Sequence, residues 1–580
     1  MRRSLKGRIA AALASLAITL TATASTFTAP VVSAGNGYNY AEALQLSLYL
    51  YDANKCGAGI ADGALTWRKD CHTFDAKYTA ANTNLPGSIT GSYGQYLDPD
   101  GDGYIDLSGG YHDAGDFVKF NLPAAYSCST LAWGAYEFKD SFVQTKTMDH
   151  LLEILKWFGD YFIKCTFLDG SGKAFAYCYQ VGEGGPDHSK WRAPELDTTS
   201  TVSRKAYFVT SSNKSSDQCY EAAAALDSAA LIFKDYDADY SAKLIKYAKA
   251  LYQFGKDCGG QITNEACSGF YNSESWQDDM AWAACWMFLA TGDSSYKSDA
   301  LQCKEYCGWF HSWAKVMLGY FEIANEIGIT PSTGNISTEL NNLKNSYTKS
   351  SGYICGTDWG SARYNTAWNL AALAYINSSG STDLLPSVTQ QMEYLLGKNN
   401  NGLSYLIGYG SKYPQFPHHR GSAQNLSTSE STDKQKYVLW GALVGGPDGN
   451  GTYLDITDKY QYSEVAIDYN AAMVGALAGM YKFAGSGDST RDLSGISEIN
   501  AGYKFYSGGG GGSEEPFMLG DVTGDKKINV QDVAKLAKAA LNLVTLTDTE
   551  KKAGDVTGDG KINVQDVAKL AKVALNLITL

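Results

Sequence analysis

An acidic motif early in the chain places two carboxylates close together. Residues 109–116 read GGYHDAGD, so only two small residues separate Asp113 from Asp116. If both side chains enter one cavity, their mutual repulsion raises the pKa of one carboxyl and suits that group to act as a base. Asp and Gly are also common in ordinary turns, so the motif alone is a weak indication of chemistry.

A second group of reactive residues lies far along the chain. Glu464 begins an apolar stretch, and Asp455 lies shortly before it. We expect Glu464 to open a helix, where a glutamate is ordinarily explained by the helix dipole. His418 and Arg420 close an earlier loop, and a histidine beside an arginine can orient carboxylates or hydroxyl groups.

The elements that position these residues are predicted to be helices. Between residues 35 and 485, apolar residues recur at helical spacing in about twelve segments. Clear examples are residues 40–52, 122–140, 146–164, 217–235, 240–255, 276–289, 364–376 and 464–483. Long polar, glycine-rich stretches over residues 53–118, 166–216 and 397–463 are expected to be functional loops. We therefore predict an all-α barrel or toroid; a helical solenoid is the alternative, although no fixed repeat period occurs here.

Three segments of this region resemble glycoside hydrolase family 9 almost residue for residue. They are NYAEALQLSLYLYDANKC, LTWRKDCHTFDA and GGYHDAGDFVKFNLPAAYS, and the resemblance extends over residues 37–483. It implies an (α/α)6 toroid and identifies residues 35–485 as a catalytic domain. It also implies hydrolysis of β-1,4-glucosidic bonds by an endo-1,4-β-glucanase (cellulase), with inversion at the anomeric carbon.

The resemblance implies a role for each candidate catalytic residue. Asp116 would be the base that deprotonates the attacking water, and Asp113 would help to hold that water. Glu464 would be the acid that protonates the leaving oxygen, and Asp455 would support either Glu464 or the loop. His418 belongs to a substrate-holding His-x-Arg pattern. Inversion requires base and acid carboxyls about 6.5 to 9.5 Å apart.

Four further residues are expected to bind the sugar. Arg420 belongs to the same substrate-holding pattern as His418, and Tyr469 is expected near the scissile residue. His188 and Trp191 resemble a segment that lines the family's cleft, with Trp191 as a platform on which glucose stacks. The 40 Tyr and 12 Trp of the chain suit such stacking, although core packing explains them equally well.

The sequence leaves the mode of action open. An open-cleft endo enzyme is favoured because neither a cellulose-binding module before the linker nor an immunoglobulin-like domain before residue 35 is evident. The alternatives are a processive or exo-acting glucanase and an enzyme for xyloglucan or mixed-linkage glucan. A non-catalytic carbohydrate-binding subunit is a further alternative, against which the intact Asp116 and Glu464 argue.

Two cysteine clusters suggest a metal or disulfide site. Cys56 is followed by Cys71 and His72 in a loop-like stretch, which suits either a disulfide or a zinc site whose fourth ligand is not identified by spacing. Cys258 and Cys267 flank a short loop and form a candidate local disulfide.

A calcium site in the same domain is a weaker expectation. Ser275, Asp278 and Asp279 resemble the segment that holds structural calcium in the family. Ala314 follows Trp313 at a position where the family has an aspartate. One expected ligand is therefore missing.

A short sequence is repeated near the C-terminus, beyond a Gly/Ser-rich linker assigned to residues 486–518. DVTGDKKINVQDVAKLAK begins at residue 521 and DVTGDGKINVQDVAKLAK at residue 555. Oxygen-bearing residues recur at positions 1, 3, 5, 9 and 12 of each copy, the spacing with which a twelve-residue loop surrounds Ca²⁺. These candidate ligands are Asp521, Thr523, Asp525, Asn529 and Asp532 in the first copy and Asp555, Thr557, Asp559, Asn563 and Asp566 in the second.

Each loop is predicted to be followed by a helix but not preceded by one, unlike an EF-hand. Residues 519–580 thereby resemble a dockerin, the module through which cellulosomal enzymes bind a cohesin on a scaffoldin. The resemblance implies two Ca²⁺ sites and two alternative cohesin-facing surfaces, which begin at Val530 and Val564. Lys526 replaces the glycine expected at loop position 6, so we expect weaker calcium binding in the first loop.

Charge and the N-terminal segment limit the partners and the location. The 580 residues contain 48 Lys+Arg against 61 Asp+Glu, and the net charge of -13 is opposite to what nucleic acid attracts. Residues 1–34 combine basic residues, a short apolar run and a small-residue cleavage pattern, which is typical of a signal peptide. No later segment has about 18 uninterrupted apolar residues, so no membrane anchor is expected. We predict a secreted, cellulosome-associated protein whose partners are cellulose or a related β-glucan and a cohesin.

Overall fold

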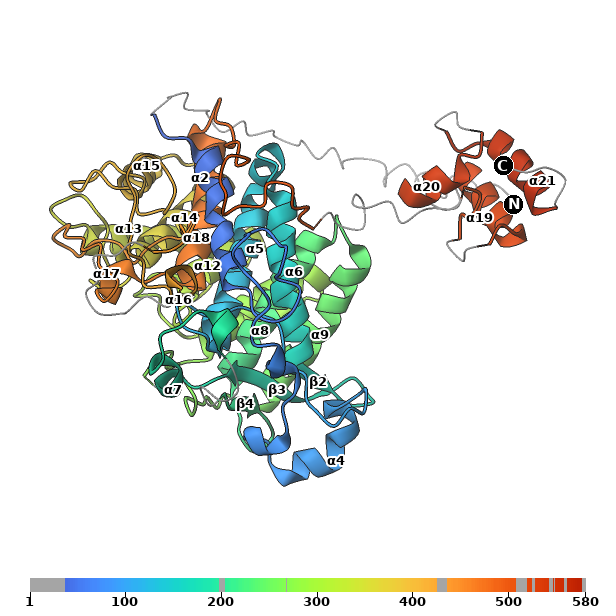
Figure 1. Ribbon diagram of the computed structural model, residues 1–580, viewed down its shortest axis with the longest axis horizontal. Helices are drawn as coiled ribbons and strands as arrows, with labels where there is room; N and C mark the ends of the chain where they lie inside the picture. The colour runs from blue at the N-terminus through green and yellow to red at the C-terminus, as the bar shows by residue number, and fades with distance from the viewer. Residues whose placement is uncertain are drawn as a thin grey trace, which may run out of the picture.

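Six helices in the described part of the chain pack pairwise into a closed ring. They lie within the large helical body of Figure 1. In order around the ring they are α5 (Asn121–Gln144), α8 (Ser216–Phe233), α10 (Gln277–Thr291), α12 (Met317–Glu326), α14 (Ser361–Ser379) and α18 (Ile467–Ala484), and α18 packs back onto α5. A second layer surrounds them, formed by α6 (Met148–Cys165), α9 (Ala238–Asp257), α11 (Ser295–Ala300), α13 (Ile336–Tyr347), α15 (Leu385–Leu395) and α2 (Tyr40–Ser47). The predicted (α/α)6 toroid is confirmed.

Burial explains the two layers. All but one residue of α8 is buried, as expected for a helix enclosed by neighbours on every side. Small residues let the inner helices approach closely: a Cβ added at Gly134 of α5 would lie 2.7 Å from the Cα of Gly475 in α18. The outer helix α9 instead buries one face, with Leu244, Ala248 and Leu251 at helical spacing.

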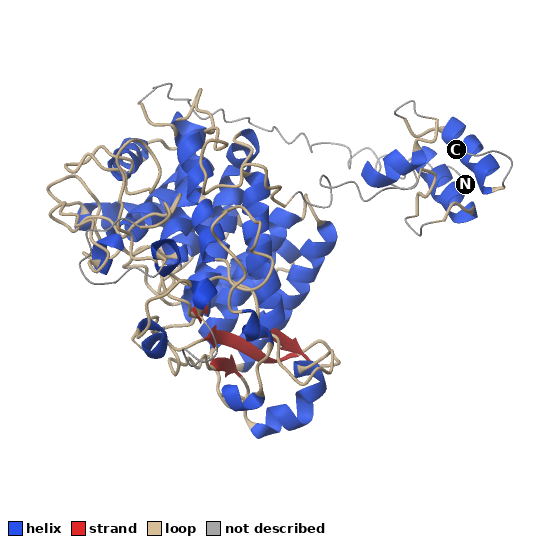
Figure 2. Cartoon of the chain, viewed as in Figure 1, coloured by secondary structure: helices blue, strands red, loops and turns tan. Residues whose placement is uncertain are grey.

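A four-stranded antiparallel sheet lies in a stretch that we expected to be loop (Figure 2). The strands are β1 (Lys119–Phe120), β2 (Thr166–Leu168), β3 (Ala174–Val181) and β4 (Ala206–Val209). β3 is central, because its Tyr177 pairs with Thr166 on one edge and Val209 on the other. The loop prediction for residues 166–216 is therefore wrong over β2, β3 and β4, whereas β1 lies outside the predicted loops. Since β3 is buried along its whole length, it lacks the alternation that would have revealed it.

Shorter elements interrupt the long loops. The short α-helices are α3 (Tyr49–Asn54), α4 (Gly87–Leu97), α7 (Gly184–His188), α16 (Arg420–Ala423) and α17 (Tyr460–Ser463); the 3-10 helices are η1 (Thr73–Ala76), η2 (Ala80–Asn82) and η3 (Pro194–Leu196). Loops 113–120, 357–360 and 464–466 lead directly into α5, α14 and α18. They therefore meet at the N-terminal ends of the inner helices.

The segment after α18 belongs to the large body. Leu493 and Ile499 are buried in its core, and the Tyr506 hydroxyl donates to Asp237 Oδ2 at 2.9 Å. The linker predicted for residues 486–518 therefore begins too early, because aromatic and aliphatic side chains anchor this part. Residues 507–518 lie outside the described residues.

The C-terminal region contains α19 (Val530–Ala540), α20 (Asp548–Gly554) and α21 (Val564–Ala574). Helices α19 and α21 pack together around a small core of Val522, Leu536, Leu546, Val556 and Leu570. Asn529 and Asn563 cap α19 and α21 in the same way, each within a capping box. Two equivalent loop-helix units are therefore present, as predicted.

The structure describes residues 37–197, 204–267, 269–424, 435–506, 519–523, 527–541, 546, 548–557 and 561–575. The predicted signal peptide, Asp525 and Asp559 lie outside these ranges. Among the helices described, none has both the length and the apolar character needed to cross a membrane.

Candidate active site

One cavity of about 870 Å³ gathers residues from distant parts of the chain. Eight of the nine predicted catalytic and sugar-binding residues line it: Asp113, Asp116, His188, Trp191, His418, Arg420, Glu464 and Tyr469. The early acidic motif and the late glutamate, which are hundreds of residues apart in sequence, thus face the same space. Aromatic rings of Phe270, Tyr271, Trp313, Trp359 and Tyr460 complete much of the wall.

Gly115 allows the early and late loops to touch. A Cβ at this position would lie 2.3 Å from the backbone oxygen of His418, so no other residue fits without moving one of the loops. Ile467 N donates to Asp113 O at 2.9 Å, and Arg420 Nε donates to Gly115 O at 2.8 Å. The close packing of the two loops therefore explains why a glycine stands at this position of the Asp-Ala-Gly-Asp motif.

The two early carboxylates have different surroundings. Burial raises the pKa of Asp113 well above its usual range, and the adjacent Asp116 raises it further; the Tyr271 hydroxyl donates to Asp113 Oδ2. Burial also raises the pKa of Asp116, but Ala114 N and Val118 N donate to its two oxygens at 3.0 and 3.2 Å and favour the charged form. The arrangement suits a protonated Asp113 beside an ionised Asp116.

Glu464 does not open a helix, contrary to the sequence prediction. α17 ends at Ser463, Glu464 has extended backbone, and α18 begins only at Ile467. Two strand-like contacts explain the break: His418 N donates to Ser463 O at 2.9 Å, and Gly445 N donates to Glu464 O at 2.8 Å. The extended connection directs the carboxyl group into the cavity.

Two donors hold one oxygen of Glu464. Trp359 Nε1 and the Tyr469 hydroxyl donate to Glu464 Oε2 at 3.0 and 3.1 Å. Enclosure raises the pKa of Glu464, and these two hydrogen bonds oppose that rise. Glu464 is thus a carboxyl group with a raised pKa and one oxygen fixed in place, as a proton donor requires.

Trp359 is a site residue that the sequence analysis missed. Its ring is 49% exposed and lies 5.0 Å from that of Tyr460, which is 44% exposed. Exposed aromatic pairs beside carboxyl groups suit contact with sugar faces. The only signal in the sequence is a tryptophan in the glycine-rich stretch just before a helix.

His418 is held as a neutral imidazole. Burial lowers its pKa, and its Nδ1 lies 2.7 Å from Thr457 O, which assigns the proton to that nitrogen. The ring of Trp191 meets that of His418 edge-on, with centroids 5.0 Å apart. His188 lies on α7, with Nδ1 2.6 Å from Gly184 O.

Arg420 lines the cavity, but its guanidinium is engaged in hydrogen bonds with other parts of the protein. Its guanidinium donates to the backbone oxygens of Gly115, Asp187 and Lys190 and to the Asp187 carboxylate. It is 3% exposed, so this side chain ties three cavity loops together. The predicted direct contact of Arg420 with the sugar therefore competes with these hydrogen bonds to the protein.

Asp455 is not part of the cavity lining. Its two oxygens accept from Gln415 N at 2.8 Å and Phe416 N at 3.1 Å. These residues directly precede the Pro417–Arg420 segment. Asp455 therefore fixes the loop that carries His418, which is one of the two roles that the sequence suggested for it.

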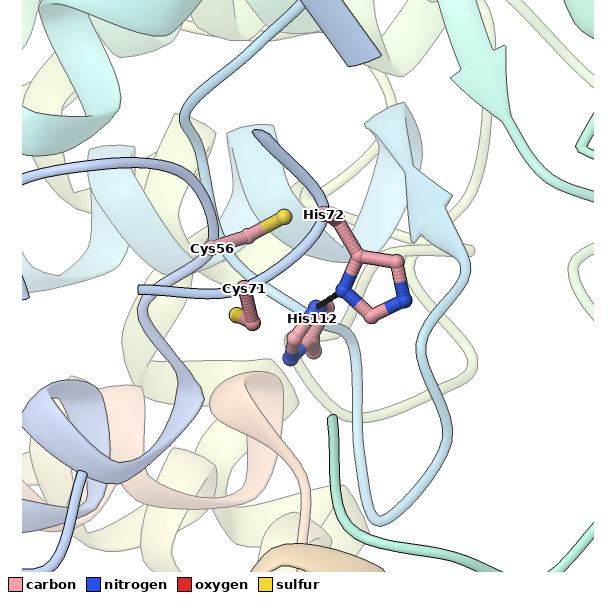
Figure 3. Close-up of side chains that lie close together, drawn as sticks. All are labelled: Cys56, Cys71, His72 and His112. Carbon is pink, nitrogen blue, oxygen red and sulfur yellow. Dashed lines mark hydrogen bonds between the residues drawn. The ribbon is translucent and has the colours of Figure 1, made fainter. Parts of the chain in front are cut away.

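Four metal-binding side chains meet behind the acidic motif (Figure 3). Cys56, Cys71, His72 and His112 are all buried, and one ligand atom from each lies within 4.8 Å of the others. Two thiols and two imidazoles are the donors of a tetrahedral zinc site, so this set fits zinc. The Asp197 carboxylate lies 3.2 Å from His72 Nε2, a common outer partner of a zinc-binding histidine. His112 completes this set of four side chains, which spacing along the sequence could not identify.

The predicted disulfide between Cys258 and Cys267 is wrong. Both are free and buried in the structure, and Cys258 instead contacts Cys219 on α8. Helix α9 ends at Asp257, so Cys258 lies against the inner layer and faces α8. Local spacing in the sequence could not reveal that neighbour.

The segment expected to hold calcium lies beside a positive charge of the protein itself. Asp278 Oδ2 accepts from Val316 N at 3.2 Å, and the nearby Lys315 ammonium lies 3.2 Å from Glu305 Oε2. The charge of Asp278 also raises the pKa of Lys315. A lysine ammonium thus supplies positive charge beside the predicted Ser275, Asp278 and Asp279 ligands.

The described parts of the C-terminal loops bring oxygen atoms together. In the first loop, Thr523 Oγ1 lies 2.8 Å from Asp532 Oδ1 and 3.4 Å from Asp521 Oδ1. In the second, Thr557 Oγ1 lies 2.7 Å from Asp566 Oδ1 and 3.5 Å from Asp555 Oδ1. Clusters of hard oxygen donors at equivalent positions fit calcium. The lysine at loop position 6 falls outside the described residues.

A helical toroid with carboxyl groups and exposed aromatic rings gathered in one cavity has the features of an enzyme that cleaves glycosidic bonds. The family model of glycosyl hydrolase family 9 matches residues 40–477, and that of the type I dockerin domain matches residues 519–573. The chain belongs to glycosyl hydrolase family 9 and carries a dockerin domain. Both resemblances found in the sequence are confirmed.

Solved structures and curated relatives agree with this assignment. The chain is 41% identical to the catalytic domain of CelT from Clostridium thermocellum, with a TM-score of 0.75 over 79% of this chain and 99% of that one. It is 37% identical to the cellulase Cel9M of C. cellulolyticum, with a TM-score of 0.67 over 77% and 99% of the two chains. Endoglucanase A of Bacillus pumilus is 33% identical, over 78% of this chain and 68% of the relative.

Proposed function

We propose that this chain is an endo-1,4-β-glucanase that hydrolyses internal bonds of cellulose with inversion of configuration. One observation carries the proposal: Asp116 and Glu464 line the same aromatic-walled cavity. The names of the relatives support the substrate, since the chain is similar to several endoglucanases and to a cellulase solved with cellobiose.

The proposed mechanism follows from the surroundings of the three carboxyl groups. Asp116, whose charge is favoured by two backbone N–H donors, accepts a proton from the attacking water. Asp113, with its strongly raised pKa, stays protonated and holds that water. Glu464 delivers its proton to the leaving oxygen on the other side of the bond. The exposed rings of Trp359 and Tyr460 support the sugar beside Glu464.

The test uses carboxymethylcellulose and three variants of the full chain. Asp116→Ala and Glu464→Ala should each lower kcat by a factor of about 10³. Asp227→Asn is the control, because Asp227 is a buried carboxyl group in α8 that does not line the cavity. Near-normal activity of either alanine variant would refute the assignment.

The products test the remaining parts of the proposal. A fall in viscosity with few new reducing ends indicates endo action, whereas early release of short sugars would indicate a processive or exo mode. Formation of the α-anomer indicates inversion. Retention of the β-anomer would contradict the roles of Asp116 and Glu464 as base and acid.

We also propose that the chain is exported and docks through its C-terminal domain onto a cohesin. The two loop-helix units present the same exposed surface, since Val530 and Val564 are both 74% exposed and Leu541 and Leu575 are 69% and 68% exposed. Ca²⁺ in the two loops would hold each unit folded, because five buried aliphatic side chains form a small core. The first residue of the mature protein, expected to be residue 35, tests export.

Binding to a type I cohesin domain tests docking. Chelation of calcium should abolish binding, and binding that does not depend on calcium would contradict the proposal. Val530→Asp or Val564→Asp alone should leave binding largely intact if the surfaces are alternatives. The double variant should bind at least 100-fold more weakly.

We further propose that Cys56, Cys71, His72 and His112 hold a structural zinc ion. When bound, zinc would join the loop after α3 to the loop that carries Asp113, since His112 directly precedes it. Each ligand belongs to the chain, so the site has the closed set of donors typical of structural zinc.

A further inference from the structure

Three glutamates meet at the end of the ring opposite the cavity. Glu137 lies on α5, and Glu322 and Glu326 lie on α12; one carboxylate oxygen of each is within 4.8 Å of the others. Glu137 is 16 positions beyond the first residue of α5, which places it about 24 Å along that helix from the cavity end. The cluster is therefore separate from the catalytic site.

One carboxylate oxygen of Glu322 has no hydrogen-bond donor among the described residues. The residue is 0% exposed, and Ser378 Oγ donates to Oε1. Oε2 is buried and has no hydrogen-bond partner among the described residues. A buried carboxylate oxygen without a donor is costly, so its persistence calls for a positively charged ligand or a proton.

Glu137 is held firmly in the same cluster. Trp133 Nε1 donates to its Oε1 at 3.1 Å, and Asn377 Nδ2 donates to its Oε2 at 3.1 Å and to its backbone oxygen at 3.2 Å. The helix is kinked at the next residue, Phe138, which has non-helical dihedral angles. These neutral donors orient the carboxylate but supply no net positive charge.

No ion pair within 4 Å is formed by any of the three glutamates in the described part of the chain. The nearest lysine contact is indirect, since Lys482 Nζ donates to Asn377 Oδ1. Burial raises the pKa of Glu322 to about 7, and burial together with Glu326 raises that of Glu137 well above its usual range. Glu137 also forms a hydrogen bond with Glu326, which requires a proton between them when no cation is bound. No charged group of the protein compensates the fully ionised cluster.

We propose that Glu137, Glu322 and Glu326 bind a Ca²⁺ ion that fastens α5 to α12 at the closed end of the ring. Carboxylate oxygens are the ligands of hard divalent cations. Mg²⁺ gives up its waters reluctantly and usually binds only one or two carboxylates of a protein, whereas Ca²⁺ accepts six to eight oxygens in a flexible geometry. Three carboxylates from one chain thus favour calcium. Glu326 is partly exposed and gives the ion and its waters a route in.

The test counts calcium bound to the full chain by equilibrium dialysis after calcium has been removed. The C-terminal loops bind calcium as well, so the informative quantity is the difference between variants. Glu322→Gln should bind one Ca²⁺ fewer per chain than the wild type, and Mg²⁺ at the same concentration should not replace it. Glu326→Gln, changed at a partly exposed position that the fold tolerates, should weaken the same site about tenfold.

Asp227→Asn is the matched control. Asp227 is also 0% exposed, and both of its carboxylate oxygens lack a hydrogen-bond partner in the described structure, but it belongs to no cluster of acids. It should bind as much calcium as the wild type. Equal calcium content in wild type, Glu322→Gln and Glu326→Gln would overturn the proposal. So would a large-domain melting temperature that is indifferent to calcium but falls steadily between pH 5 and 8, since a shared proton would then stabilise the cluster.

Discussion

Trp359 Nε1 lies 3.0 Å from Glu464 Oε2, so an exposed ring on one loop directly touches the candidate proton donor on another. The same ring lies 5.0 Å from Tyr460 and faces the sugar-binding cavity. If a substrate sugar contacts Trp359, we expect its binding and the protonation of Glu464 to be coupled through this side chain. A sugar that stacks on Trp359 also orders the group that holds the acid.

Trp359→Phe should shift the alkaline limb of the pH profile upward. The N–H of Trp359 favours the ionised form of Glu464, so its removal raises the pKa of that group, and activity is lost only at higher pH. We expect the alkaline limb of kcat/KM to move up by about half a unit to one unit. The measurement is kcat/KM on a soluble cello-oligosaccharide across pH 4 to 9.

Trp313→Phe provides the control for this shift. Trp313 lines the same cavity, but its Nε1 has no hydrogen-bond partner among the described residues. The substitution alters an aromatic wall without altering the hydrogen bonds of Glu464. Equal shifts in the two variants would show that the Trp359 hydrogen bond does not tune the acid.

Gly115→Ala should separate the base loop from the loop that carries His418. The added Cβ would meet the His418 backbone oxygen at 2.3 Å, and misplacement of a reacting group by about 1 Å typically costs about 100-fold in rate. We expect kcat to fall at least 100-fold while far-ultraviolet circular dichroism remains unchanged. Gly91→Ala in α4, where nothing lies within 4 Å, should be as active as the wild type.

The sequence predicted the toroid and most of the cavity because both leave local traces. Apolar residues recur at helical spacing in segments of both layers, and the residues around Asp113, His418 and Glu464 form recognisable motifs. What the motifs could not show is the direction of each side chain. Asp455 belongs to such a motif but accepts hydrogen bonds from a loop outside the cavity lining. Arg420 belongs to another, but its guanidinium donates hydrogen bonds to backbone oxygens.

Other features of the fold and the site could not be predicted, because no local pattern in the sequence indicates them. Trp359 follows no pattern that distinguishes it from a core tryptophan, and strand β3 is buried on both faces, so neither shows a period. His112 was hidden because it stands inside the acidic motif, where its neighbours account for the sequence. The contact of Cys258 with Cys219 depends on how α9 packs against α8, which spacing along the chain does not encode.

The buried ion pairs that Asp52 forms with Lys55 and His150 should make the stability of the large domain depend on pH in the acid range. Burial alone would raise the pKa of Asp52, but Lys55 at 2.9 Å and His150 at 2.7 Å outweigh it and lower the pKa to about 2. Because the folded pKa lies below the unfolded value of 3.8, this stabilisation is complete above pH 4 and is lost as the pH falls through 2. Asp52→Asn should lower the free energy of unfolding by about 2 kcal/mol at pH 7 and by progressively less towards pH 2.

Asp235→Asn tests whether burial is the reason for the large stability loss expected in Asp52→Asn. Asp235 pairs with Lys139 at 2.5 Å, but the two side chains are 63% and 41% exposed. Exposed pairs contribute about 0 to 1 kcal/mol, so this variant should unfold close to the wild-type temperature at every pH. A loss as large as that of Asp52→Asn would refute the explanation.

The thiol and imidazole cluster should determine zinc content. Purified full-length protein should contain one zinc ion per chain, and Cys56→Ser should remove it, since a hydroxyl is a far poorer zinc ligand than a thiolate. Cys285→Ser is the matched control: Cys285 is as buried as Cys56 but belongs to no group of metal-binding side chains in the described structure, so its variant should keep the zinc. Because His112 is bonded directly to Asp113, loss of zinc should also lower kcat, whereas a purely remote structural ion would change only the melting temperature. Wild-type protein without zinc, in which Cys56 and Cys71 resist thiol reagents as a disulfide, would instead support the other interpretation of this pair.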